Sequence, residues 1–224
     1  SVSPWDPPPL CSRGDSVSPW LSGKGAALRV EEAEVMRRIV VGISGASGII
    51  YGIRLLQALR QQPELEIHLV ITRSGGVTLR LENPEWELAD VQKLAHVVHR
   101  EGDIAASIAS GSFAVESMVV APCSMRSLAA IAHGLSDNLL TRAADVILKE
   151  RRKLVLVTRE TPLHAVHLKN MLTVTEMGAI VLPPMPGFYH QPKTMQDLID
   201  HVVGKILDTL GFEQNLFPPW TGLS

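Results

Sequence analysis

The 224-residue sequence lacks the features that mark membrane-spanning and nucleic-acid-binding proteins. No apolar run approaches the roughly 18 uninterrupted residues that a membrane-spanning helix needs. The formal net charge is only −2, so no general excess of positive charge favours nucleic acid or an anionic membrane. Aromatic residues make up only 4% of the chain. We therefore expect neither nucleic acid nor a membrane among its partners.

Cysteine and metal-binding motifs are also scarce. The two cysteines, Cys11 and Cys123, cannot form a disulfide framework, and the sequence has no CxxC, no HExxH and no Asp-rich run that would hold magnesium. It also has no Gly-x-Ser-x-Gly elbow, which marks a class of hydrolases. We expect a reducing, cytoplasmic setting and a reaction without metal. Arginine, lysine and carboxylate side chains must then manage any phosphate charge themselves.

The first 35 residues differ in composition from the rest. The pentapeptide SVSPW occurs at Ser1–Trp5 and again at Ser16–Trp20, within a stretch rich in Pro, Ser and Gly. Such a composition buries too little apolar surface to offset the entropy lost on ordering. Met36, which precedes two arginines and the first apolar run, looks like a natural start. We expect residues 1–35 to be a disordered or artefactual extension, and residues 36–224 to form a single domain with a C-terminal tail.

From Arg38 onward, β-rich apolar runs alternate with segments of helical periodicity. The expected strands are residues 38–43, 66–72, 117–122, 153–158 and 179–184. The expected helices are residues 49–59, 74–82, 86–98, 124–133, 138–150, 163–177 and 195–210. This alternation predicts an α/β fold with an open, mostly parallel sheet. Ligands bind such sheets at the carboxyl ends of the strands, so the loops that follow the strands are the candidate site.

A glycine-rich loop follows the first strand. Gly42, Gly45 and Gly48 are three residues apart, which matches neither the GxGxxG of dinucleotide sites nor a P-loop with its lysine. Glycine permits positive φ and close backbone approach, and the next helix would offer free N–H donors to an anion. Thr72 ends the second strand where NAD sites usually carry a carboxylate, which favours a mononucleotide such as FMN. A tight turn without a ligand is the alternative.

Two residues after the third strand have both a structural and a functional interpretation. Ser124 is placed to cap the following helix, and contact with a ligand is the alternative. Cys123 belongs to a nucleophilic residue type, but no histidine is adjacent in sequence. Because a small buried cysteine is commoner than a catalytic one, packing is favoured for Cys123.

Charged residues recur near the later strand ends. Arg142 and Lys149 are seven residues apart on one helical face, where a solvated surface is the alternative to a binding role. We assign residues 151–153 to such a solvated surface. Arg159 and Glu160 end an apolar strand at the functional rim of the sheet, where packing explains a charge poorly, so function is favoured.

The loop PGFYHQP at residues 186–192 follows the fifth strand. Its proline and glycine restrict the backbone and present Tyr189 and His190 outward. We expect His190 to be a structural hydrogen-bonding residue and the Tyr189 hydroxyl to be able to bind phosphate.

Three stretches together resemble the flavin prenyltransferase family, the UbiX-type proteins formerly called phenylacrylic or aromatic acid decarboxylase subunits. They are SGASGIIYGIRLL, VAPCSMRSLAAIAHGLSDNLLTRAADVILKERRKLVLVTRETP and PPMPGFYHQP. The resemblance runs from about Met36 to Trp220, and TRAAD, LKERR, LVLVTRETP and GFYHQP are its most specific parts. It implies a Rossmann-like, three-layer flavoprotein fold and assembly into trimers and dodecamers with active sites between subunits.

The resemblance also implies an activity. Members of the family transfer a dimethylallyl group, usually from dimethylallyl monophosphate, to N5 and C6 of reduced FMN. The product, prenylated FMN, serves as the cofactor of a separate family, the UbiD-type decarboxylases. This activity agrees with the absence of a metal motif, because cations must then bind the phosphate and an acid must protonate it.

Individual roles follow from positions in the family motifs. Glu160 would be the general acid/base, Ser47 would relay the proton of flavin N5, and Glu82 would lie near the prenyl group. The expected FMN-site residues are Gly45, Ala46, Ser47, Thr72, Ser124 and Arg159. The expected prenyl-phosphate and enclosing residues are Arg142, Lys149, Arg159, Tyr189, Lys205 and Trp220. Lys205 stands where many members have arginine, and Arg126 where some have glycine and others a basic residue.

Two other functions stay open. One is an FMN-dependent cysteine decarboxylase, which shares the fold and a similar DNLLTRAAD-like helix but lacks the TRETP and GFYHQP pairing. The other is a non-catalytic subunit that carries flavin to a decarboxylase.

Overall fold

The structure is a computed structural model that describes residues 36–220 and residue 222. The strands are β1 (Arg37–Ile43), β2 (Leu65–Ile71), β3 (Val97–His99), β4 (Ser117–Cys123), β5 (Lys153–Thr158) and β6 (Ile180–Val181). The helices are α1 (Ile49–Leu59), α2 (Arg73–Glu82), α3 (Leu88–Gln92), α4 (Met125–Ala132), α5 (Leu139–Lys149), α6 (Ala165–Glu176) and α7 (Met195–Leu210), with a 3-10 helix η1 at Ser107–Ala109. The extension expected at residues 1–35 lies outside the described residues.

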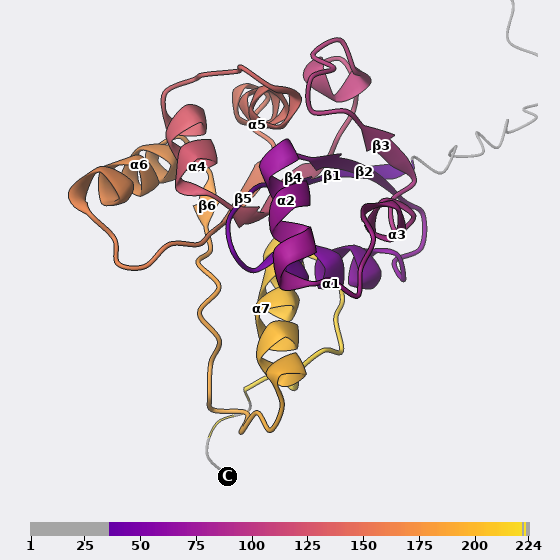
Figure 1. The fold of residues 1–224 in the computed structure, drawn as a ribbon, viewed down its shortest axis with the longest axis vertical. Coiled ribbons are helices and arrows are strands. Elements are labelled where there is room, and N and C mark those ends of the chain that lie inside the picture. Colours follow the sequence, from indigo (N-terminus) through magenta and orange to yellow (C-terminus); the bar gives the residue numbers. More distant parts are fainter. Residues whose placement is uncertain (1–35, 221, 223–224) are drawn as a thin grey trace, which may run out of the picture. The chain divides into compact units, whose positions relative to one another are not determined.

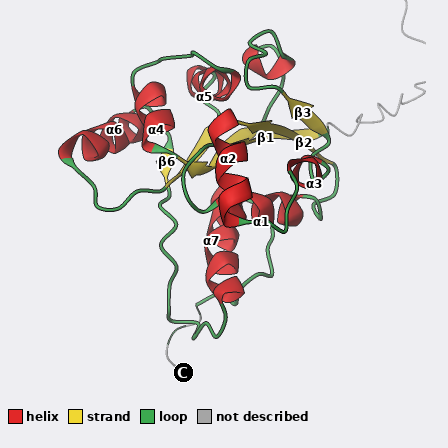
Figure 2. Cartoon of the chain, in the orientation of Figure 1, coloured by secondary structure: helices red, strands yellow, loops and turns green. Residues whose placement is uncertain are grey.

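The strands form one parallel sheet in the order β3-β2-β1-β4-β5-β6. The chain moves outward from β1 through β2 to β3, then returns to β4 on the other side of β1 and continues to β6. The direction of winding therefore reverses between β1 and β4, which is where doubly wound sheets bind their ligands. This confirms the predicted α/β, Rossmann-like fold with a parallel sheet (Figure 2).

Helices cover both faces of the sheet, as Figure 1 shows. Alternate residues of β1 point to opposite faces, because side chains alternate along a strand. Ile39, Val41 and Ile43 pack with α1 and α7 in one buried cluster. Val40 packs in the other cluster, with residues of α4 and α5. The strands read as continuous apolar runs because both faces of the sheet are buried.

Two expected elements are wrong. Residues 86–98 were predicted to be one helix, but helix α3 spans only Leu88–Gln92 and Val97–His99 form the edge strand β3. The fifth predicted strand, 179–184, is only Ile180–Val181. The apolar spacing of residues 88–98 also fits a helix, and a three-residue edge strand produces no periodic signal of its own. The sheet therefore has six strands where the sequence predicted five.

Basic residues at the start of β5 attach a neighbouring loop and the end of α7 to the amino-terminal edge of the sheet. Arg152 donates hydrogen bonds to the carbonyls of Gly111 (2.8 Å) and Phe113 (3.0 Å). Lys153 Nζ donates to the carbonyl of Thr209 at 2.8 Å. Assigning these two residues to a solvated surface was wrong for Arg152, which is half-buried, and incomplete for Lys153.

Among residues 36–220 and 222, no helix combines the length and the apolar character required to cross a bilayer.

Candidate active site

Hydrogen bonds hold together three loops at the carboxyl edge of the sheet. Ser44, just after β1, donates from its hydroxyl to the carbonyl of Pro122 at 2.8 Å and accepts from the N–H of Ser124 at 2.8 Å. Thr72, just after β2, donates its backbone N–H to the carbonyl of Ile43 at 2.9 Å. These bonds fix the positions of the β1–α1, β2–α2 and β4–α4 loops relative to one another, at the point where the winding reverses.

The three glycines of the first loop serve different purposes. Gly48 is the N-cap of α1 with φ 97°, a left-handed conformation that favours glycine. A Cβ at Gly45 would overlap the side chain of Ser74 at the start of α2, so glycine there permits close packing. A Cβ at Gly42 would lie 3.0 Å from Leu140 Cδ1 of α5. Positive φ is therefore required at one of the three.

A carboxylate occupies the start of α1. Glu82 Oε2 accepts from the N–H groups of Gly48 (2.8 Å) and Ile49 (3.3 Å). Negative charge is favourable there because a helix N-terminus carries a partial positive charge. The expectation that these N–H donors are free to bind an anion is therefore wrong in this conformation. Glu82 connects the end of α2 to the glycine loop.

A cavity of about 510 Å³, here called the rim cavity, brings together four of the predicted residues: Ser47, Glu82, Arg159 and Glu160. Its other lining residues are Gly48, Ile50, Tyr51, Asn83, Thr158, Thr161, Pro183, Pro184, Met185, Met195 and Ile199. The lining therefore combines charged and polar residues with apolar residues and prolines.

Several polar groups in the rim cavity have no partner among the described residues. The buried Oγ1 of Thr158 and the buried Oδ1 of Asn83 have no hydrogen-bond partner within residues 36–220. The Arg159 guanidinium also pairs with no carboxylate of that part of the chain. Glu160 Oε1 accepts a hydrogen bond from the N–H of Thr161 at 3.0 Å. Buried polar groups in proteins are normally paired, so Thr158 Oγ1 and Asn83 Oδ1 are candidate contacts for a polar ligand, while the exposed guanidinium of Arg159 is open to an anion.

The electrostatics of the rim cavity reflect partial burial beside a cation. Burial raises the pKa of Tyr51 above its ordinary value, and the positive charge of Arg159 lowers it in part. Tyr51 is therefore an uncharged hydroxyl at neutral pH. The backbone N–H of Arg159 donates to the carbonyl of Cys123 at 3.1 Å, which fixes the end of β5 to the end of β4.

A second cavity of about 430 Å³, here called the loop cavity, contains Gly45, Thr72 and Ser124. It is also lined by Ser44, Arg73, Ser74, Glu101, Arg126 and Ser127. The lining is rich in hydroxyls and contains two arginines. These are groups that bind phosphate in proteins. Ala46, which was also predicted for the FMN site, is buried in the same loop and lines neither cavity.

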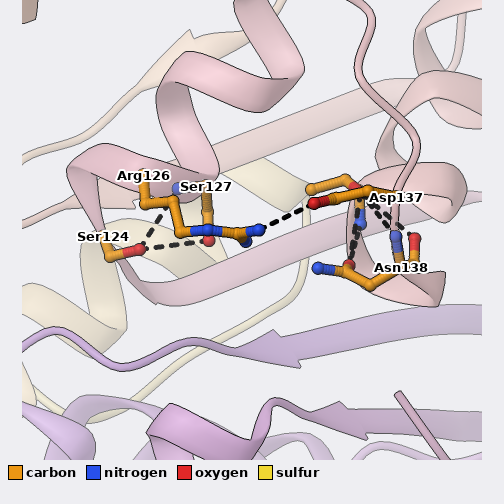
Figure 3. Close-up of polar contacts among 6 residues, drawn as sticks. Ser124, Arg126, Ser127, Asp137 and Asn138 are labelled. Carbon is orange, nitrogen blue, oxygen red and sulfur yellow. Dashed lines mark hydrogen bonds and ion pairs between the residues drawn. The ribbon is translucent and has the colours of Figure 1, made fainter. Parts of the chain in front are cut away.

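The start of α4 is built by capping. Ser124 accepts from the N–H of Ser127 at 3.2 Å, which confirms its predicted capping role. Arg126, in the first turn of the helix, reaches Asp137 with Nη2 to Oδ2 at 2.7 Å, as Figure 3 shows. Arg126 therefore faces both the loop cavity and the segment that precedes α5.

Arg142 and Lys149 do not meet the other predicted residues within one chain. Both lie on α5 and line neither the rim cavity nor the loop cavity. Arg142 Nη1 pairs with Asp145 at 2.8 Å and its Nε donates to the carbonyl of Ala109 at 3.2 Å. Lys149 pairs with Glu150.

Tyr189, Lys205 and Trp220 also lie outside the two cavities. The Tyr189 and Trp220 rings meet edge to face with centroids 5.5 Å apart, and Trp220 is 60% exposed. Lys205 on α7 lies 3.6 Å from Asp208. These three predicted residues therefore lie on or beside α7, and their side chains are largely exposed.

Cys123 is a packing residue, as predicted. It is fully buried, and burial raises the pKa of its thiol to about 12. A thiol in that state is a poor nucleophile.

Sequence reasoning missed Tyr51, Asn83 and Thr158 of the rim cavity. Thr158 could have been found, because it is the last residue of a correctly predicted strand at the ligand-binding edge. Tyr51 and Asn83 carry no such positional signal.

The chain is similar to proteins of known family. A family model described as Flavoprotein matches residues 28–207. The protein "Flavin prenyltransferase UbiX" of Escherichia coli (strain K12) is 51% identical over 189 residues, which cover 84% of this chain and 100% of that protein.

Two solved structures agree with this match. AnUbiX (PadA1) in complex with FMN and dimethylallyl pyrophosphate is 47% identical with a TM-score of 0.82, over 84% of this chain and 99% of that one. A dodecameric FMN-dependent Ubix-like decarboxylase from Escherichia coli O157:H7 is 48% identical with a TM-score of 0.81, over 83% of this chain and 100% of that one.

A PPC decarboxylase mutant bound to pantothenoylaminoethenethiol is only 21% identical with a TM-score of 0.52, over 67% of this chain and 83% of that one, which is a likeness of fold alone. Because the identities are near 50% along nearly the full length of the relatives, the chain belongs to the UbiX-type flavin prenyltransferases of the flavoprotein family.

Proposed function

We propose that this chain is a flavin prenyltransferase, which moves a dimethylallyl group from dimethylallyl monophosphate to N5 and C6 of reduced FMN. The observation that carries the proposal is the rim cavity, where Arg159 and Glu160 lie beside Ser47, Glu82 and two unpaired polar atoms. The product would be prenylated FMN, passed to a UbiD-type decarboxylase. Residues 36–224 would form a single domain for this reaction, and the cytoplasmic setting expected from the cysteine content stays a prediction.

The two cavities suit a phosphate-bearing flavin. The loop cavity would take the phosphate, since Thr72 and Ser124 present hydroxyls there and Arg73 and Arg126 present positive charge. Ser47 in the adjacent rim cavity would lie by the ring system. Gly45 and Ala46 would shape the wall between these parts, and Arg159 would contact the flavin from the end of β5. Reduced FMN supplies the nucleophilic atoms that accept the prenyl group.

The chemistry assigned to the chain is charge stabilisation and proton transfer. Arg159 would bind the prenyl phosphate, because its guanidinium faces the cavity without a carboxylate partner among the described residues. Glu160 would act as general acid/base beside that phosphate, Ser47 would move the N5 proton, and Glu82 would stand near the prenyl group. The apolar wall of Pro183, Pro184 and Met185 and their neighbours would exclude water from a reactive allylic group.

The rest of the predicted site would come from neighbouring copies. Arg142, Lys149, Tyr189, Lys205 and Trp220 line neither cavity of their own chain. A trimer or dodecamer with sites between subunits would add their charges and rings to the rim cavity of another copy. The dodecameric relative from Escherichia coli O157:H7 supports such an assembly.

The test is an anaerobic incubation of the protein with reduced FMN and each of two donors, dimethylallyl monophosphate and dimethylallyl pyrophosphate. Mass spectrometry should detect a five-carbon adduct of FMN, formed faster from the monophosphate. The complex of AnUbiX with the pyrophosphate makes the second donor a necessary arm. Absence of the adduct with both donors, from folded protein that binds FMN, would reject the proposal.

The other two functions make different predictions. A cysteine decarboxylase should reduce bound FMN when given a peptide or pantothenoyl substrate that ends in cysteine. A flavin carrier should activate a decarboxylase without forming any adduct. The identities near 50% to flavin prenyltransferases, against 21% to the PPC decarboxylase, favour prenyl transfer.

A further inference from the structure

A buried histidine on α7 contacts the loop that carries Tyr189. His201 is 5% exposed. Its Nδ1 accepts a hydrogen bond from the backbone N–H of Gly187 at 3.2 Å. Its Nε2 lies 3.3 Å from the Tyr189 hydroxyl. A Cβ at Gly187 would lie 2.9 Å from Tyr189 Cε1 and 3.1 Å from His201 Nε2, so glycine lets the loop pack against both rings.

The first of these hydrogen bonds determines the second. A backbone N–H can only donate, so Nδ1 of His201 must be the unprotonated nitrogen. The proton of a neutral imidazole is then on Nε2, which faces the Tyr189 oxygen. His201 therefore donates and Tyr189 accepts. The phenolic proton of Tyr189 is left free to donate elsewhere.

With the opposite tautomer, Tyr189 would donate its own proton to His201. The phenol would then present only lone pairs to a ligand, and lone pairs repel phosphate oxygens. The tautomer of His201 thus decides whether Tyr189 can donate to an anion.

We propose that His201 is a positioning residue that holds the Tyr189 hydroxyl with its proton available for the prenyl phosphate. This inference rests on the proposed function, which assigns Tyr189 to that phosphate. His201 touches neither the substrate nor the flavin in this assignment, and it acts through Tyr189.

The surroundings of His201 keep it neutral. Its pKa lies below the ordinary value, first because the ring is buried and then because His190 and Lys205 are nearby, while Asp208 acts in the opposite direction. The His190 ring stacks on it with centroids 4.8 Å apart and an angle of 3° between the planes. The hydrogen bond from the Gly187 N–H determines the tautomer of this neutral ring, and stacking on His190 supports its orientation.

Two substitutions separate the two contacts of His201. His201→Asn retains an acceptor near the Gly187 N–H but cannot reach Tyr189. His201→Gln retains a donor near the position of Nε2. We expect His201→Asn to raise KM for dimethylallyl monophosphate about three- to tenfold with little change in FMN binding, because one hydrogen-bond donor to the phosphate is lost. His201→Gln should restore most of that loss.

A third variant distinguishes a failure of the Tyr189 assignment from a failure of the role given to His201. Tyr189→Phe should raise the same KM, and adding His201→Asn to it should cause no further increase, because the two residues act through one hydroxyl. If Tyr189→Phe leaves KM unchanged, the assignment of Tyr189 to the phosphate fails. If Tyr189→Phe raises KM while His201→Asn does not, or if the two effects add fully, the positioning role of His201 is overturned.

Discussion

Glu160 is the residue on which the proposed chemistry depends most. It lies at the end of β5 in the rim cavity, next to an arginine without a carboxylate partner in the described part of the chain. The substitution Glu160→Gln retains the shape and removes the transferable proton. We expect the rate of adduct formation to fall at least a hundredfold, in line with the loss of a general acid. Anaerobic single-turnover assays with mass detection measure this rate.

The control for Glu160 is Glu213→Gln, because Glu213 is exposed and its side chain makes no hydrogen bond or ion pair among the described residues. FMN binding should be normal in both variants. Adduct formation by Glu160→Gln at the wild-type rate would show that another group supplies the proton.

The thiol of Cys123 should be inert in the folded protein. With a pKa of about 12, roughly one thiol in ten thousand is ionised at pH 8, and the residue is fully buried. Iodoacetamide should therefore label Cys123 only on unfolding, as peptide mass mapping in buffer and in urea can measure. Equal labelling rates in the two solutions would contradict a packing role.

Among single residues, those at strand ends were the most predictable. Arg159 and Glu160 stand out in the sequence because charges follow an apolar strand at an edge where ligands bind. The contact of Glu82 with the start of α1 was not predictable, because it joins residues more than 30 positions apart through the packing of α2. Arg142 and Lys149 were assigned by resemblance. The helical periodicity of the sequence could not predict that they lie outside the rim cavity of their own chain.

At the scale of the element, helix α1 begins without a cap of its own. Its N-cap, Gly48, makes no side-chain capping bond, and Glu82 supplies the acceptor instead. Replacing Glu82 with alanine should lower the free energy of unfolding by about 1 kcal/mol, the usual effect of a lost N-terminal cap. Urea unfolding at fixed protein concentration measures this change.

The matched control for the cap is Glu87→Ala. Glu87 precedes α3 and is exposed, and it makes no side-chain capping bond. The Glu87→Ala variant should have the same urea midpoint as the wild type within experimental error. Glu82→Gln should fall between the wild type and Glu82→Ala, because an amide oxygen still accepts a hydrogen bond but has no charge. Equal stability of all three Glu82 forms would mean that the contact does not support α1.

The pair of strands at one sheet edge should be sensitive to acid. His68 Nδ1 of β2 and His99 Nε2 of β3 lie 2.8 Å apart, and burial lowers the pKa of both rings below the ordinary value of 6.5. Below pH 6.5 the unfolded chain therefore binds more protons than the folded one, so stability falls as pH falls through the folded pKa values. Above pH 6.5 this contribution is fully present.

Denaturant unfolding between pH 7.5 and 5 should show this loss, before most carboxylates titrate. Glu66 Oε1 lies 3.1 Å from His68 Nε2 and raises the pKa of His68, but burial is the larger effect, so the pKa stays below its ordinary value. The double variant His68→Gln/His99→Gln should flatten the pH dependence. An unchanged slope would assign the effect to other groups.

The long elements were predicted well, because their periodicity is sustained. The bounds of α1, α7 and β5 match those expected from the sequence. The short strand β3 was predicted as part of a helix, and the short strand β6 was predicted to be longer than it is. Their ends are set by pairing with a neighbouring strand, as in the contact of His96 N with the carbonyl of Ile67, and local sequence does not encode that partner.

For the whole molecule, α6 presents an unusual surface. Only Asn170 and Val174 of this helix are buried, while Val166, Leu168 and Leu172 are more than half exposed. A helix with so much exposed apolar area favours contact with another protein surface. Another copy of this chain is favoured as the partner, because a relative is dodecameric and because no residue of α5 lines the rim cavity of its own chain.

The double variant Leu168→Glu/Leu172→Glu should therefore reduce assembly and prenyl transfer together, because separate subunits would lose Arg142 and Lys149 from the shared site. Light scattering coupled to size exclusion measures the mass, and the adduct assay measures activity. Ile104→Glu, at an equally exposed loop residue, is the control. Full activity from a monomer would refute a site shared between subunits.

Basic residues at the two ends of β5 have different environments. At the amino edge, Arg152 and Lys153 donate hydrogen bonds to backbone carbonyls of a distant loop and of α7. At the opposite edge, the Arg159 guanidinium lines the rim cavity and makes no hydrogen bond or ion pair within the described residues. Stability of the fold and preference for the donor therefore depend on different residues. Substitutions around Arg159 can change the donor preference without destabilising the sheet. Loss of Arg152 would destabilise the packing at the amino edge and leave the residues of the rim cavity unchanged.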